Sequence, residues 1–137
     1  MKYTDYYDHL KELEYPVVPY SEHPHGDIGW KGKMVYASPD KFLSLARKLE
    51  HPRADSLTYL RDKMLNGEKL DYLILFVDMN KKKVTGHEGR HRATIARELG
   101  IKKVPIFVYT GNSYARTPEW TKKDHDIVDN LKFSPEA

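Results

Sequence analysis

Three residues near the middle of the chain have the types and spacing of a site that could do chemistry. His87, Glu88 and His91 follow one another as His-Glu-x-x-His within "KKKVTGHEGRHRATIARELG", residues 81–100. On a continuous helix this spacing places two imidazoles on one face, where they can bind zinc while the glutamate polarises a metal-bound water. A zinc hydrolase is therefore the first hypothesis that the motif raises.

The glycines around the motif favour a different local structure. Gly86 and Gly89 enclose its first two residues, and each glycine costs a helix about 1 kcal/mol relative to alanine. The residues just before them are β-prone. The pattern predicts a short strand over 83–85, a turn over 86–89 and a helix over 91–99.

A glycine-rich turn between a strand and a helix is also a place to bind phosphate. Glycines let the backbone approach an anion, and the first N–H groups of the helix then point at it. Arginine forks suit phosphate oxygens. The alternative is that the arginines pair with surface carboxylates. The predicted phosphate ligands are Gly86, Gly89, Arg90, His91 and Arg92.

Phosphoryl transfer further needs charge neutralisation, usually by Mg²⁺, and one group that positions or deprotonates the nucleophile. Glu88 is the candidate for that group or for a Mg²⁺ ligand, and His87 is the second catalytic candidate. Contacts to the base or to other parts of a nucleotide are assigned to Ser38, Asp40 and Lys83.

Length and composition narrow the class of protein. A chain of 137 residues is long enough for one domain with its own core, and the absence of cysteine excludes disulfides and thiolate chemistry. The longest apolar run, Leu73 to Val77, is too short to cross a bilayer, and residues 1–10 lack the apolar segment of a signal peptide. We therefore expect a cytoplasmic protein with no membrane partner.

The charge balance argues against a protein that coats DNA. The 23 basic residues are nearly matched by 20 acidic ones, which gives a net charge of +3. The run Lys81 to Lys83 is either a solvated hairpin tip or a local patch for nucleic acid.

Apolar periodicity indicates how the motif is positioned. Helices are predicted over 39–49, after an N-cap at Ser38, and over 55–66; a further helix is predicted from an N-cap at Thr117 to Leu131. Strands are predicted over 34–37, 71–78 and 104–109, and Pro105 suggests that the last of them is an edge strand or contains a bulge. Together they predict an α/β (α+β) fold, a small mixed sheet with packed helices.

Beyond these elements, residues 2–13 are a predicted short helix, and "HPHGD", residues 23–27, is either a turn or a second metal site. Trp30 and Tyr36 are either stacking partners for a base or packing residues.

The segment "VTGHEGRHRATIARELGIKKVPIFV" resembles the second signature of the ParB/sulfiredoxin superfamily. Partition-type ParB proteins carry Gly-Glu-Arg-Arg-x-Arg-Ala there. The residues that match this pattern are Glu88, Arg90, Arg92 and Ala93. The pattern has a glycine at the position of His87 and an arginine at the position of Gly89. Sulfiredoxins carry a reactive cysteine at the position of Arg90, which excludes that activity.

The resemblance covers residues 33–109, which divides the chain into an N-terminal segment (1–32), a ParB-like core (33–109) and a C-terminal extension (110–137). The start of this core also resembles small ParB-like proteins of phages and mobile elements, for which the compartment would be the host cytoplasm. The resemblance implies ATP or CTP bound with Mg²⁺ at the turn, and hydrolysis or transfer of the terminal phosphoryl group. The alternatives are a ParB-like DNase or a non-catalytic module that binds nucleic acid or protein. With any of these functions the protein could also bind nucleic acid and form a homodimer.

Overall fold

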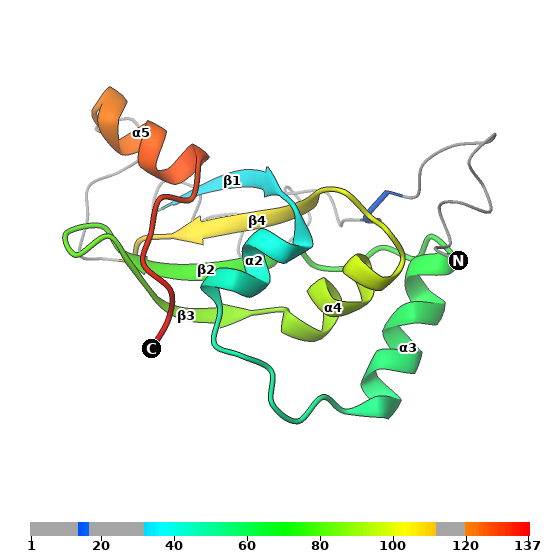
Figure 1. The fold of residues 1–137 in the computed structure, drawn as a ribbon. Helices are drawn as coiled ribbons and strands as arrows, with labels where there is room; N and C mark the ends of the chain where they lie inside the picture. The colour runs from blue at the N-terminus through cyan, green and yellow to red at the C-terminus, as the bar shows by residue number, and fades with distance from the viewer. Residues whose placement is uncertain (1–13, 17–31, 112–119) are drawn as a thin grey trace.

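A four-stranded mixed sheet forms the centre of the protein (Figure 1). The structure is a computed structural model that describes residues 14–16, 32–111 and 120–137. The strand order is β1-β4-β2-β3, with β4 antiparallel to β1 and parallel to β2, and β2 antiparallel to β3. The strands are β1 (Gly32–Ala37), β2 (Leu73–Asp78), β3 (Lys83–Glu88) and β4 (Val104–Tyr109).

Helices pack on one face of this sheet. Figure 1 shows α2 and α4 lying across it, α3 outside α4, and α5 beside β1. None of the helices in the described ranges is long and apolar enough to cross a membrane. The helices are α2 (Pro39–Leu45), α3 (Ala54–Leu65), α4 (Arg90–Glu98) and α5 (Lys122–Asp129). This combination of helices and a mixed sheet confirms the predicted fold class.

The apolar run of β2 is buried on both faces of the sheet, as its continuous pattern predicted. Leu73 and Leu75 join the main core under the helices, whereas Ile74, between them, belongs to a smaller cluster on the other face with Tyr72 and Phe107. Successive side chains of a strand point to opposite faces, so both clusters are needed to cover the central strands.

Tertiary contacts changed several predicted element ends. The helix predicted over 39–49 ends at Leu45, because Ala46 is already extended with ψ 156°. The predicted N-cap at Thr117 was wrong for the last helix, which begins at Lys122. Thr121 caps it in a capping box with Asp124, where each side chain bonds to the other residue's backbone N–H.

Pro105 does not mark an edge strand, because β4 lies between β1 and β2. The pairing of β4 with β2 begins only at Ile106, opposite Leu73. Pro105 therefore sits at the end of β4 where β1 is its paired neighbour, and its missing N–H interrupts no contact with β2.

Candidate functional site

The junction between β3 and α4 carries the His-Glu-x-x-His residues. The strand continues to Glu88 instead of ending at residue 85, so the predicted four-residue turn over 86–89 was wrong. The turn is made by Gly89 alone, whose φ of 109° and ψ of 21° lie in the left-handed region. The helix begins at Arg90, next to the predicted start.

This junction does not form the helix that a zinc site of this motif requires. His87 lies in β3 and His91 in α4, so the two imidazoles are not one helical turn apart. Within the residues that the structure describes, no group of three or more histidine or acidic side chains is arranged to hold a metal ion.

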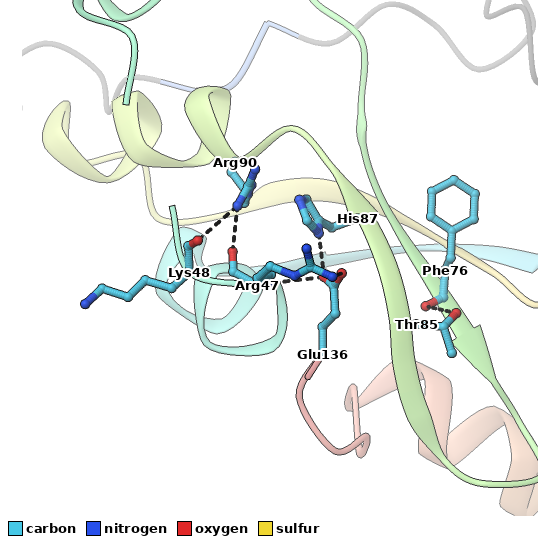
Figure 2. A network of polar contacts seen from close by, with 7 residues as sticks. All are labelled: Arg47, Lys48, Phe76, Thr85, His87, Arg90 and Glu136. Atoms are coloured by element: carbon cyan, nitrogen blue, oxygen red, sulfur yellow. Dashed lines mark hydrogen bonds and ion pairs between the residues drawn. The ribbon is translucent and has the colours of Figure 1, made fainter. Parts of the chain in front are cut away.

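A β-bulge sets the direction of His87. The pairing of β2 with β3 shifts between Phe76 and Val77, which leaves Thr85 as the extra residue, and its hydroxyl donates to the carbonyl of Phe76 at 3.2 Å. Beyond the bulge His87 lies opposite Leu75, a residue of the main core. The imidazole is thereby on the face of the sheet that the helices cover (Figure 2).

Glu88 is directed differently because it is the next residue of the strand. It lies opposite Ile74, which belongs to the cluster on the other face of the sheet. Its side chain is 58% exposed, and its Oε1 is 3.9 Å from Nη2 of Arg92. The two predicted catalytic residues thus approach the strand end from opposite sides.

A pocket of about 350 Å³ opens where β3, α3 and α4 meet. Ser56 in the first turn of α3 and Leu60 one turn later form one wall. The other wall contains six consecutive residues, His87, Glu88, Gly89, Arg90, His91 and Arg92. The structure therefore brings together all the predicted phosphate and catalytic residues except Gly86.

Two helix N-termini meet at this pocket. Within the described residues neither α3 nor α4 has a side-chain N-cap, and the first N–H bonded within α4 is that of Ala93, to the carbonyl of Gly89. Nε2 of His91 accepts from the N–H of Arg53 at 3.3 Å, which joins the start of α4 to the N-cap position of α3. The free N–H groups of the first turns give this region a partial positive charge.

Arg90 is held in place by the segment after α2. Its Nη1 donates to the carbonyls of Arg47 and Lys48, at 3.1 and 3.0 Å (Figure 2). A guanidinium has five N–H donors, so its other N–H groups remain for a ligand. These two carbonyls also lie just beyond the point where α2 ends.

Arg92 is built more deeply into the fold, since its side chain is only 13% exposed. Its Nη1 donates to the carbonyls of Asp71 and Tyr72, at 2.7 and 3.3 Å. The hydroxyl of Tyr15 donates to the same Asp71 carbonyl at 2.7 Å. Burial raises the pKa of Tyr15 to about 12, although the nearby charge of Arg92 opposes this.

His87 has a partner that its local sequence did not suggest. Its Nδ1 is 2.5 Å from Oε2 of Glu136, and the two side chains are 15% and 7% exposed. Glu136 also accepts from the N–H of Arg47 at 3.0 Å, and its own N–H donates to the carbonyl of Leu45 at 2.8 Å. Figure 2 shows the carboxylate between the Arg47 side chain and the imidazole.

Glu136 is held as a carboxylate at this position. Burial by itself would raise its pKa, but the hydrogen bonds from His87 and the Arg47 amide, together with their charges, outweigh burial and lower the pKa below its ordinary value. Because a carboxylate has no proton to donate, Nδ1 of His87 must carry the shared proton.

This lowered pKa predicts how stability depends on pH. A carboxyl whose folded pKa is below its unfolded value stabilises the fold above the unfolded pKa, near 4.5, and this stabilisation is lost as pH falls through the folded pKa. Glu136→Gln should therefore lower the free energy of unfolding by about 1.5–3 kcal/mol at pH 7, and the difference from wild type should shrink as pH falls below about 4.5 and through the lowered folded pKa. Denaturant unfolding across this pH range measures it; a constant difference would mean that the charge is not what stabilises the fold.

The remaining predicted site residues lie away from the pocket. Gly86 is inside β3, where an added Cβ would be 3.2 Å from the ring of Phe76. Lys83 begins β3 at the opposite end from Glu88, about 16 Å away at the rise of a strand. Ser38 caps α2 through the N–H of Lys41, and Asp40 is 3.7 Å from Arg97. The predicted helix over 2–13, the "HPHGD" segment, Trp30 and Thr117 lie outside the described residues.

Comparison with protein-family models, with curated proteins and with solved structures finds no match to the chain. The family resemblance therefore rests on the sequence of residues 33–109 alone.

Proposed function

We propose that this protein binds the triphosphate of a nucleotide, ATP or CTP, in the pocket at the β3–α4 junction, and hydrolyses or transfers its terminal phosphoryl group. The observation that carries the proposal is the meeting of two N-termini without side-chain caps beside Arg90 and Arg92. N–H groups at helix starts and arginine forks are what phosphate oxygens bind. The volume of about 350 Å³ is within the range of small-molecule sites.

The way the arginines are held supports this proposal. Main-chain carbonyls fix Nη1 of Arg90 and Nη1 of Arg92, so both guanidinium groups are ordered before a ligand arrives. Ordering a side chain in advance reduces the entropy that binding must otherwise remove. The arginines differ in this respect from surface lysines such as Lys81, whose side chain is exposed.

Glu88 fits the role of a Mg²⁺ ligand in this proposal. Mg²⁺ is usually bound through one or two carboxylates together with substrate phosphates, and Glu88 offers a mostly exposed carboxylate whose contact with Arg92 is long, at 3.9 Å. When bound, the ion would neutralise charge on the β- and γ-oxygens.

A thermal-shift screen of the four ribonucleoside triphosphates, with and without Mg²⁺, tests the proposal. At a free ligand concentration 100 times the dissociation constant, binding should stabilise the protein by about 2.7 kcal/mol. A protein that ignores all four triphosphates and instead binds nucleic acid, with an affinity that falls steeply with salt, would be the non-catalytic module or the DNase of the alternative interpretation.

Arg90→Ala tests the phosphate assignment itself. Loss of one charge-assisted contact, worth about 1.5–3 kcal/mol, should weaken triphosphate binding about 10- to 100-fold in a calorimetric titration. Lys81→Ala is the matched control, because it removes the same charge from an exposed hairpin residue and should change affinity less than about threefold. If the two substitutions changed triphosphate affinity equally, Arg90 would have only a structural role.

A further inference from the structure

The contact between His87 and Glu136 has a geometry that anchoring a chain segment does not require. The carboxylate accepts from Nδ1 of the imidazole at 2.5 Å, and the same imidazole lines the pocket. A carboxylate on one ring nitrogen fixes the tautomer, the ring orientation and the basicity of the other nitrogen. In Figure 2 the side of the ring away from Glu136 faces Arg90, a residue of the pocket wall.

We infer that His87 is the general base of the proposed reaction and that Glu136, from the segment after α5, is the residue that positions it. This inference rests on the proposed function, and it assigns the two acidic residues to different tasks. Glu88 lies on the opposite side of the strand end from His87, and its proposed role is to bind Mg²⁺. Glu136 is 7% exposed and does not line the pocket, so it is assigned to the reaction through its contact with the imidazole.

With this arrangement, water is the only reactant besides the nucleoside triphosphate. Nε2 of His87 takes a proton from water as the water oxygen forms a bond to the terminal phosphorus. The bond from that phosphorus to the bridging oxygen breaks, and its electron pair stays on the nucleoside diphosphate. The proton then passes from Nε2 to solvent, which leaves the diphosphate and inorganic phosphate. Glu136 stabilises the imidazolium while it exists, as carboxylates paired with catalytic histidines do.

Two substitutions of Glu136 show whether it positions the imidazole of His87 or only anchors the segment after α5. Glu136→Gln keeps an oxygen that can accept from Nδ1 but removes the charge, and Glu136→Leu removes both. For a positioning residue we expect kcat for phosphate release to fall in the order wild type, Gln, Leu, with a loss of about 10- to 100-fold for Leu. KM for the triphosphate should stay within about threefold, because the phosphate ligands on α4 are untouched. Glu98→Leu is the control, since it removes another carboxylate from a long-range ion pair, with Arg61 at 2.8 Å, outside this pocket.

A spectroscopic measurement tests the pair without any nucleotide. A long-range ¹H–¹⁵N correlation spectrum of the imidazoles, with the His87 signals assigned from their loss in His87→Gln, should show the proton of His87 on Nδ1 at the assay pH. In Glu136→Leu this single tautomer should give way to a mixture or to the Nε2–H form. The amide spectrum of the same sample shows whether the variant is folded.

The outcomes are distinct. A proton on Nε2, or on both ring nitrogens, in the wild type overturns the inference, and so does an unchanged kcat in a folded Glu136→Leu protein. A wild type that binds a triphosphate without hydrolysing it also overturns the inference but leaves the proposed binding site standing. A wild type that binds no triphosphate overturns the proposed function itself.

Discussion

Replacing Glu88 with glutamine is expected to lower phosphate release about 10²–10⁴-fold, the usual contribution of a positioned catalytic group. The reason is the loss of the carboxylate that would hold Mg²⁺ at the end of β3 in the proposed reaction. The amide is nearly isosteric, and the side chain is 58% exposed with one long contact to Arg92, so the fold should tolerate the change. Triphosphate binding without Mg²⁺ should be unchanged or tighter, because one negative charge beside the phosphates is removed.

The Glu88 experiment needs three measurements on the same two proteins: phosphate release across a Mg²⁺ titration, triphosphate affinity without the ion, and melting temperature. A rise in the Mg²⁺ concentration needed for half-maximal turnover would identify Glu88 as a ligand of the ion. Unchanged hydrolysis combined with a lower melting temperature would make Glu88 a structural residue. Glu98→Gln provides the control, since it makes the same chemical change on an exposed face of α4, outside the residues that line the pocket.

Substitution of Gly89 by alanine should lower the free energy of unfolding by about 2–4 kcal/mol. Gly89 has a φ of +109°, and an added Cβ would lie 2.4 Å from Cδ2 of Leu73, a side chain with no exposed surface. The left-handed backbone conformation accounts for about 1 kcal/mol, and forcing an extra carbon into a packed core accounts for about 1–3 more. At this chain length the melting temperature should fall by about 10 °C.

Gly67→Ala is the matched control for this experiment. Gly67 has a φ of +70° but no atom within 4 Å of an added Cβ, so only the left-handed conformation, worth about 1 kcal/mol, is penalised. Calorimetric unfolding of both variants separates conformational strain from crowding against the core. Equal losses in the two proteins would show that the close approach to Leu73 relaxes easily, and that Gly89 is needed for its φ alone.

The local sequence was sufficient to predict those features of the fold that depend on a few adjacent residues. The continuous apolar run from Leu73 to Val77 predicted a strand buried on both faces. Asn66 and Gly67 predicted the end of α3, because a glycine accepts the positive φ that ends a helix. Gly89 predicted the break before α4, since a helix through it would be destabilised. Each of these features depends on the preferences of a few adjacent residues.

The direction of His87 could not be predicted in this way. A side chain of a strand reverses its face with every residue, so one extra residue at Thr85 transfers His87 from one face of the sheet to the other. That extra residue exists only relative to the partner strand β2. Pairing between strands, and not the spelling of the motif, put the imidazole on the side of the helices.

The partners of the site residues were likewise decided by the tertiary structure. Glu136 is 49 residues from His87, and the carbonyls that hold Arg90 are 43 and 42 residues away from it. Nothing in the residues next to Glu136 distinguishes it from an ordinary surface glutamate, because its lowered pKa comes from His87 and Arg47. The sequence by itself determined that a strand ends and a helix begins near Gly89, next to Arg90 and Arg92, since glycine and apolar spacing act over a few residues. Only the packed chain determined which groups meet at that break, since those contacts join segments that are adjacent in space and distant along the chain.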